Sequence, residues 1–247
     1  MNRYFKILML FQYIIPFSKY RKCYRTFINN KSENYIFYKN GNKIILVDNE
    51  EKEVNLTSIK GLTIKVTGFN NIIKIKSPYI FGNTNIFING DNNTIEIKNT
   101  HPSGIYNATF QLGAKADNRS IFIDENFSCS GINFGLNVSN YSINIGKDCM
   151  FSNEIVIDAD DGHVIFKKGT QVCINKPKNI FIGNHVWCGR RVLICKGTKI
   201  QDGSVIGEGS IVNKVFEESN IIIAGIPAKI VKSNVQWERY NHNSLIK

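Results

Sequence analysis

An apolar residue returns at every sixth position along the C-terminal part of the chain. The series is Ile182, Cys188, Ile194, Ile200, Ile206 and Val212, and its phase does not change. Glycine directly follows three of these residues, and a small or β-branched residue lies four positions after five of them. An amphipathic helix would need a period of 3.6 residues and a half-buried strand a period of two, so the pattern indicates neither.

A six-residue period is typical of one flat face of a triangular prism of β-strands. The apolar residue points inward and stacks on its counterparts in the coils above and below, and three faces close one coil. Glycine beside the inward residue relieves the turn. The pattern therefore predicts an all-β fold, a parallel β-helix built from hexapeptide repeats.

Longer and less regular coils are expected before this region. Residues 68–76 (GFNNIIKIK) recur as residues 90–98 (GDNNTIEIK). Each copy places Gly and Asn before a run rich in β-branched residues, which is typical of a tight corner followed by a strand. Further short strands are predicted around residues 44–47, 86–88 and 121–123.

The hexad register is interrupted once. Ile145, Phe151 and Ile157 follow the same six-residue period, but their phase differs by one residue from that of the later series. The segment between the two runs, about 158–179, contains the sequence DADDGH, which ends at His163. Excursions from a regular scaffold often carry binding and catalytic groups, so we expect the functional site there.

These patterns divide the chain into four parts. We expect a basic, partly apolar helical segment at 1–35, irregular β-helix coils at 36–142, the hexapeptide-repeat β-helix at 143–230 and a short C-terminal cap or arm at 231–247. A cap is expected because the last coil of a solenoid would otherwise present unpaired strand edges.

The formal charge of +11 is concentrated at the N-terminus, where the first 31 residues hold seven Lys and Arg and no acidic residue. Such a segment attracts anionic membranes or polymers, although a solvated basic face is equally consistent with it. The apolar stretch at 5–17 is too short to span a membrane and lacks a cleavage site, so we expect an amphipathic helix that lies on the solenoid or on a membrane interface.

The six cysteines form neither a CxxC pair nor a regular framework. This usage argues against a zinc site and a disulfide scaffold, and it favours a reducing compartment. We therefore expect a cytoplasmic protein, with peripheral contact at the inner face of the cytoplasmic membrane as a further option.

The region from Ile143 to Trp237 resembles the hexapeptide-repeat acyltransferases, whose fold is a left-handed parallel β-helix. More narrowly, it is similar to bacterial capsule, polysialic acid and sugar O-acetyltransferases. Three segments carry the resemblance: DGH at 161–163, IGNHVWCG at 182–189, and VIGEGSIVNK at 205–214, which leads to AGIPAK at 224–229. The resemblance implies direct acetyl transfer from acetyl-CoA to a hydroxyl of a cell-envelope glycan, without a metal. It also implies a homotrimer with sites between neighbouring chains.

By this resemblance His163 is the general base and Trp187 lines the site where donor and acceptor meet. The two residues can come from different protomers. Histidine suits the removal of a hydroxyl proton near neutral pH. A carboxylate, Asp161 or Asp160, could hold one ring nitrogen protonated. His185 is the main rival base.

Coenzyme A suits a groove of glycine-rich corners with a few cations. The residues expected to bind it are Trp187, Gly189, Lys196, Gly207, Lys214, Pro227 and Lys229. The backbone amide of Gly189 could also stabilise the oxyanion, at about 3 kcal/mol for one such donor. Two departures from the family pattern are Ile226, where relatives usually carry asparagine, and Cys188, where they usually carry an aliphatic residue.

Other functions remain open at this point. The acceptor could be an amino group on a nucleotide sugar or a small-molecule hydroxyl, and a non-catalytic glycan-binding solenoid would show the same hexads. Nucleic acid is not an expected partner, because no readout motif accompanies the positive charge. A γ-type carbonic anhydrase would need three zinc-binding histidines, and neither His101 nor His242 has a supporting context.

Overall fold

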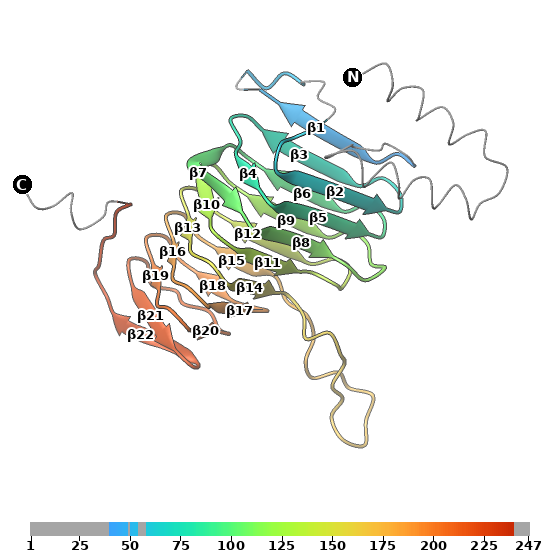
Figure 1. Cartoon of the computed structure of the whole chain (residues 1–247). Coiled ribbons are helices and arrows are strands. Elements are labelled where there is room, and N and C mark those ends of the chain that lie inside the picture. Colours follow the sequence, from blue (N-terminus) through green and yellow to red (C-terminus); the bar gives the residue numbers. More distant parts are fainter. Residues whose placement is uncertain (1–39, 49, 54–57, 240–247) are drawn as a thin grey trace, which may run out of the picture.

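The computed structural model describes residues 40–48, 50–53 and 58–239, and these residues wind into a triangular β-solenoid (Figure 1). The whole basic segment, with the helix expected at 1–35, lies outside the described residues. Within the described part of the chain there is no helix that is long and apolar enough to cross a membrane.

Three sheets form the faces of the prism, and each coil passes from face 1 to face 2 to face 3. Face 1 contains β1 (Lys43–Val47), β3 (Ile72–Lys76), β6 (Thr94–Ile97), β9 (Ser120–Ile123), β12 (Ser142–Ile145), β15 (Ile180–Ile182) and β18 (Lys199–Ile200). Face 2 contains β4 (Phe81–Gly82), β7 (Thr100–Tyr106), β10 (Phe127–Cys129), β13 (Met150–Phe151), β16 (Trp187–Cys188), β19 (Val205–Ile206), β21 (Ile222–Gly225) and β22 (Ala228–Lys232). Face 3 contains β2 (Leu62–Thr67), β5 (Thr84–Asn89), β8 (Ala108–Leu112), β11 (Ile132–Gly135), β14 (Ile155–Asp158), β17 (Leu193–Cys195) and β20 (Ile211–Val212).

The predicted hexads form the interior of the last coils. All six apolar residues of the series are buried, with 0% of their surface exposed. Ile182 pairs with Ile200, and Ile194 pairs with Val212, so each coil advances the chain by three hexads. One hexad for each face of the prism is therefore confirmed.

The N-terminal coils are longer, as their sequence predicts. Ile73 pairs with Ile95, which places the two copies of the sequence repeat directly above one another. Phe110 of β8 and Phe134 of β11 are register partners in successive coils, and their rings stack in the core with centroids 4.6 Å apart. The wider coils thus bury larger side chains.

The paired asparagines of the repeat have two different roles. Asn70 and Asn92 turn the corner with φ values of 55° and 56°, a left-handed conformation that asparagine tolerates better than most residues. Asn71 and Asn93 are buried and are joined by a 2.9 Å hydrogen bond from the Asn93 side-chain amide to the Asn71 side-chain oxygen. In the next coil, Arg119 donates from Nε to Asn93 at 2.9 Å and continues this buried polar ladder.

The change of hexad phase marks an insertion. Ile182 pairs with Ile145 on one side and with Ile200 on the other. The step from Ile145 to Ile182 is one residue longer than two regular coils, although it spans only one coil of the prism. The additional residues leave at the corner between faces 3 and 1. They project from the prism as an arm, which we define as residues 159–179 (Figure 1).

A β-hairpin closes the C-terminal end of face 2. Strand β22 pairs antiparallel with β21 and forms the edge of the sheet. An antiparallel strand stops further parallel coils from adding, and it exposes Lys229 and Lys232 at the edge, which discourages pairing with other chains. The cap expected at 231–247 overlaps only the end of this hairpin, and its last residues, 240–247, lie outside the described part of the chain.

Candidate active site

The arm is a two-stranded hairpin that carries apolar side chains into solvent. Backbone hydrogen bonds of 2.9 Å join Lys167 to Val172 and Ile174 to Ile165. The apolar residues of the arm are 48–62% exposed: Val164, Ile165, Phe166, Val172 and Ile174. Five exposed large apolar side chains on one short hairpin are typical of a contact with another surface.

Lys196 fastens the base of the arm to the solenoid. Its ammonium group donates to the carboxylate of Asp161 and, at 2.7 Å, to the carbonyl oxygen of Asn175. The Asn175 side chain also donates to Asp161, at 2.9 Å. The Lys196 contact lowers the pKa of Asp161 below its ordinary value, and the Asn175 contact acts in the same direction. The two ends of the arm, at Asp161 and Asn175, are therefore held by one cation in the following coil.

His163 lies at the start of the arm and is exposed to solvent. Its carbonyl oxygen accepts a 2.7 Å hydrogen bond from the Asn175 side chain, which fixes the local backbone. Asp160 accepts from the backbone amides of Gly162 at 2.8 Å and Asn137 at 2.9 Å. Among the described residues, no hydrogen bond joins the His163 ring to Asp160 or Asp161. Both carboxylates act on the shape and anchoring of the arm.

Trp187 lies on face 2 and points outward, with 40% of its surface exposed. The arm leaves the prism at the corner between faces 3 and 1, which is opposite face 2 (Figure 1). His163 and Trp187 of one chain are therefore on opposite sides of the solenoid. The structure of a single chain does not bring these two predicted residues together.

The other cofactor candidates separate into two groups. Gly189 and Gly207 directly follow β16 and β19, at the corner between faces 2 and 3, and Pro227 lies in the turn of the β21–β22 hairpin in the same sheet as Trp187. Lys196 follows β17 and lies at the corner between faces 3 and 1, where the arm also leaves the prism. Beyond β20, Lys214 extends over the ring of Phe216, and Lys229 lies on β22.

The glycine at position 189 is required by the close stacking of coils. A Cβ atom on Gly189 would lie 2.8 Å from the backbone nitrogen of Glu208 and 2.9 Å from the carbonyl oxygen of Ile206. The Gly189 amide donates to that same carbonyl at 2.8 Å. In this structure the amide predicted as an oxyanion donor is part of the hydrogen-bond ladder between coils.

His185, the rival base, is held by other groups. Its Nδ1 atom lies 2.6 Å from a carboxylate oxygen of Asp148, and its Nε2 atom lies 3.0 Å from the carbonyl oxygen of Trp237. Its φ of 53° belongs to a corner column that also includes Asn126 and Asp148. These contacts indicate an anchor for the C-terminal segment, which the spacing of histidines in the sequence could not show.

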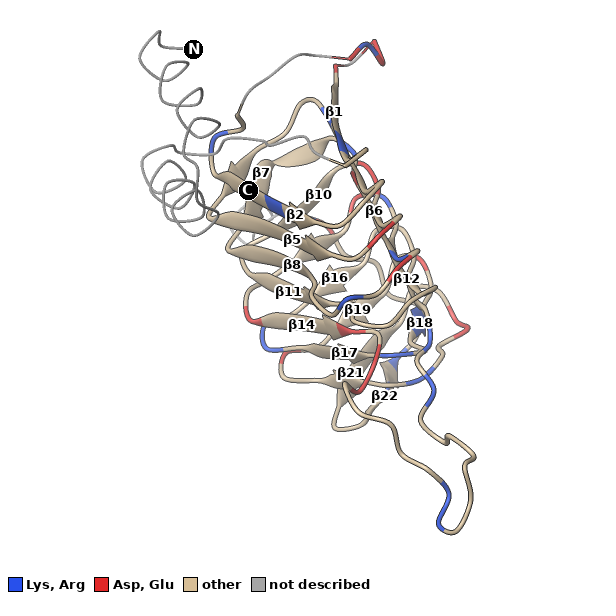
Figure 2. Ribbon diagram, turned by 90° about the vertical axis from the view of Figure 1, so that its right-hand side faces the viewer, with Lys and Arg blue, Asp and Glu red and all other residues tan. Residues whose placement is uncertain are grey.

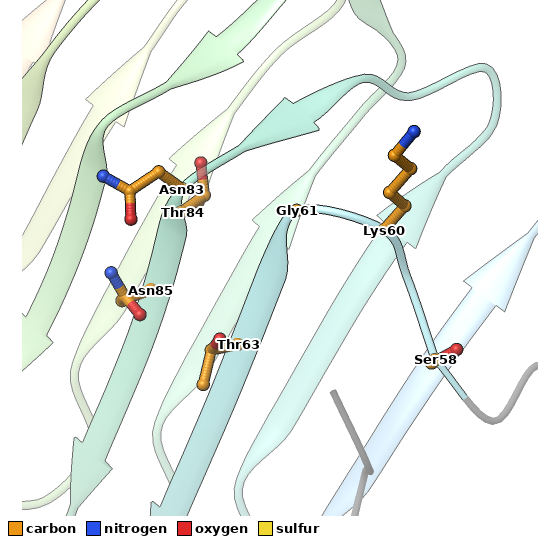
Figure 3. A pocket seen from close by; sticks show the side chains of 7 residues that line it. All are labelled: Ser58, Lys60, Gly61, Thr63, Asn83, Thr84 and Asn85. Carbon is orange, nitrogen blue, oxygen red and sulfur yellow. The ribbon is translucent and has the colours of Figure 1, made fainter. Parts of the chain in front are cut away.

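A separate cavity of about 410 Å³ opens near the N-terminal end of face 3 (Figure 3). It is lined by small polar side chains and one cation: Ser58, Lys60, Gly61, Thr63, Asn83, Thr84 and Asn85. It lies several coils away from Trp187. The described residues contain no cluster of three His, Cys, Asp or Glu that could hold a metal ion.

Comparison with known proteins identifies the class. No protein-family model matches the sequence. A polysialic acid O-acetyltransferase of Neisseria meningitidis is 33% identical over 197 residues, which cover 72% of this chain and 90% of that protein. A polysialic acid O-acetyltransferase of Escherichia coli O1:K1 is 36% identical over 116 residues, which cover 47% of this chain and 38% of that protein. The crystal structure of the polysialic acid O-acetyltransferase OatWY superposes with a TM-score of 0.67, 29% identity and coverage of 83% of this chain and 90% of that one.

The chain therefore belongs to the hexapeptide-repeat acyltransferases, and its solenoid is a left-handed parallel β-helix. Within that family its relatives are O-acetyltransferases, and the chain is an enzyme of this kind.

Proposed function

We propose that the protein transfers an acetyl group from acetyl-CoA to a hydroxyl of a bacterial cell-envelope glycan, a capsular or lipopolysaccharide sugar, with His163 as the general base. The names of its relatives support a glycan acceptor, since two of them act on polysialic acid. The observation that carries the assignment is the arm, which presents a histidine on an anchored hairpin outside an otherwise regular prism.

The chemistry needs one base and no covalent enzyme intermediate. His163 takes the proton of the acceptor hydroxyl while the oxygen attacks the thioester carbonyl. The tetrahedral intermediate then collapses, the carbon–sulfur bond breaks, and the proton passes to the departing thiolate of coenzyme A. The products are the acetyl ester and free coenzyme A.

The site is proposed to lie between two chains of a homotrimer. His163 and Trp187 of one chain are on opposite sides of the prism, so they can meet only when the arm of one copy reaches face 2 of another. The exposed apolar residues of the arm, such as Phe166 and Ile174, support this contact, because a neighbouring copy would remove them from water.

The corner beside Trp187 is the proposed binding site for coenzyme A. Gly189 and Gly207 carry no side chain at the points where the chain leaves β16 and β19, which suits the narrow pantetheine arm. Lys214 and Lys229 are exposed cations near the last coils and are the proposed phosphate contacts. Lys196 was expected to share this role, but its partners at the base of the arm favour an anchoring one.

A row of uncharged polar side chains on face 3 supports a glycan acceptor. Thr63, Asn85, Thr109 and Asn133 are register partners on consecutive strands and point outward. In Figure 2, strands β5, β8 and β11 carry no Lys, Arg, Asp or Glu. Amide and hydroxyl groups can donate to and accept from sugar hydroxyls. The row begins at the cavity lined by Lys60, which suits an anionic chain.

The basic N-terminal segment is proposed to bring the enzyme to an anionic membrane surface or to its polymer. Only its sequence supports this role, since seven cations without an acidic residue would attract either anion.

The test combines activity and chain mixing. Release of thiol from acetyl-CoA and the acetyl mass gained by the acceptor are measured with a panel of capsular polysaccharides, lipopolysaccharide sugars and amino nucleotide sugars. His163→Ala should lower kcat by about 10²–10⁴-fold, the usual contribution of a general base, and leave the KM for acetyl-CoA unchanged. Lys168→Ala, a change on the same arm, serves as the control and should retain activity.

Mixing of inactive variants tests the shared site. When His163→Ala and Trp187→Ala chains are unfolded and refolded together, about a quarter of the sites should receive His163 from one chain and Trp187 from its neighbour. Recovery of activity near that fraction supports the proposal. Full activity of His163→Ala would refute the assignment of the base, and absence of recovery would refute the shared site. Acetylation of an amine alone, or no thiol release with any acceptor, would favour the alternative functions.

A further inference from the structure

The C-terminal segment runs back along the solenoid after the β21–β22 hairpin. We call residues 233–239 the strap (Figure 1). The Val235 amide donates to the carbonyl oxygen of Asn220 at 2.9 Å, and the Trp237 indole donates to the carbonyl oxygen of His185 at 2.8 Å. Arg239 reaches Asp148, one coil further back. The strap therefore crosses several coils along the corner between faces 1 and 2.

The ring of Trp237 stacks on the ring of His185. The two rings stack with centroids 4.0 Å apart and an interplanar angle of 11°. The His185 ring faces two groups that only accept hydrogen bonds, the Asp148 carboxylate at 2.6 Å and the Trp237 carbonyl at 3.0 Å. It satisfies both only if it donates from both nitrogens. Trp237 is 6% exposed, so the strap buries its side chain against the corner between faces 1 and 2.

Arg239 fixes the end of the strap. Its Nε atom donates to Asp148 at 2.9 Å, and one of its terminal nitrogens donates to the Ser128 hydroxyl at 2.9 Å. The other terminal nitrogen lies 3.1 Å from the carbonyl oxygens of Asn126, Asp148 and Cys149. The Asp148 carboxylate therefore joins His185 and Arg239, and a lysine could not reproduce the several donors of this guanidinium group.

The ring of Trp237 lies next to Trp187, the aromatic residue of the candidate active site. The centroids of Trp187 and Trp237 are 6.0 Å apart, with an interplanar angle of 44°. Trp187 is otherwise an exposed side chain on a strand face, where several staggered rotamers are open to it. A buried ring at this distance restricts those rotamers, and aromatic pairs at such spacing attract each other.

We propose that Trp237 is a positioning residue, held by His185 and Arg239, which fixes the indole of Trp187 at the acetyl-transfer site. The strap then forms one wall of the site, although it is remote in sequence from the hexads that carry Trp187. This inference rests on the proposed function, because that function places Trp187 beside the reacting groups.

The kinetic test uses Trp237→Ala, Trp237→Phe and Arg239→Met, with Glu238→Gln on the exposed side of the strap as the matched control. Trp237→Ala and Arg239→Met should lower kcat by about 10- to 100-fold, since small displacements at a reacting centre have effects of this size. Trp237→Phe keeps an aromatic ring and should retain most of the activity, and Glu238→Gln should match the wild type. The assay temperature is kept well below the Tm of every variant.

A spectroscopic readout separates positioning from folding. The chain has only two tryptophans, so in Trp237→Phe all tryptophan fluorescence comes from Trp187. In Trp237→Phe/Arg239→Met, Trp187 should become more accessible to acrylamide than in Trp237→Phe, at a temperature where both proteins are folded. A strap that only stabilises the fold would lower Tm without changing this accessibility.

Two outcomes distinguish failure of this inference from failure of the proposed function. If Trp187→Ala transfers acetyl groups at the wild-type rate, Trp187 is not in the site and the proposed function fails at that residue. If Trp187→Ala is inactive while folded Trp237→Ala and Arg239→Met keep the wild-type kcat, the positioning role is overturned and the proposed function stands.

Discussion

The contact of Lys196 with the base of the arm allows a quantitative prediction. Its ammonium group binds Asp161 and the carbonyl oxygen of Asn175, and its side chain is 18% exposed, against 43% for Asp161. A partly exposed ion pair contributes about 0.5–1 kcal/mol, and a hydrogen bond to a backbone carbonyl at a partly exposed site adds about 0.5–1 kcal/mol. Lys196→Met should therefore weaken docking of the arm by about 1–2 kcal/mol, which is close to a tenfold change in population.

Because the arm carries His163, this loss should appear in the chemical step. We expect kcat of Lys196→Met to fall by about tenfold or less, with an unchanged KM for acetyl-CoA. Asp161→Asn should act in the same direction, and the double variant should lose less than the sum of the two single variants, because the residues form one interaction. High salt screens the ion pair, so it should reduce the difference in kcat between the wild type and Lys196→Met. The Tm should change little, since the arm lies outside the buried core.

Steady-state kinetics with both substrates and a thermal melt measure these effects, and Lys168→Met is the control because it removes the same charge from the tip of the arm. The anchoring role would be refuted if Lys196→Met raised the KM for acetyl-CoA without changing kcat, while Asp161→Asn had the kinetic constants of the wild type. Lys196 would then be a contact for the phosphates of coenzyme A, as the sequence suggested.

Two further predictions concern stability. Gly189→Ala would place Cβ 2.8 Å from the backbone of the next coil and should cost about 1–3 kcal/mol, seen as a Tm several degrees lower. Gly131→Ala, whose Cβ would have nearest neighbours at 3.4 Å, is the control, and equal melting of the two variants would contradict this reasoning. Burial raises the pKa of Asp148, but hydrogen bonds from His185 and Arg239 outweigh it and hold the pKa below the ordinary 3.8. The stability that Asp148 contributes should therefore be present above this value and disappear as the pH falls below it. The Tm difference from Asp148→Asn should be full at pH values well above 3.8 and should shrink as the pH falls below 3.8 through the lowered pKa of Asp148; a difference that does not shrink in acid would refute the role of the ionised carboxylate.

The regular part of the fold could be predicted from sequence because its information is local. An inward residue at every sixth position, such as Ile182 or Ile206, indicates a face of the prism wherever it occurs in the chain. The asparagines at 70 and 92 mark corners for the same reason, since their backbone conformation suits few other residues. The one-residue change of phase after Ile157 also located the arm.

The partners of the site residues could not be predicted in this way. Asp161 was expected to orient His163, yet it binds Lys196 and Asn175, because the folding of the arm decides which groups meet the carboxylate. His185 has the residue type of a base but holds the strap. Its partner Trp237 lies 52 residues further along the chain, a separation that no local pattern spans.

The sequence by itself determined which residues face the core, where the coils turn and where the regular scaffold is interrupted, because these depend on short-range periodicity and backbone preference. Only the tertiary structure decided that the arm and Trp187 lie on opposite sides of the prism and that Trp237 lies 6.0 Å from Trp187. Those relations depend on the stacking register of whole coils and on the return path of the strap. Both arise from packing between segments that are distant in the chain.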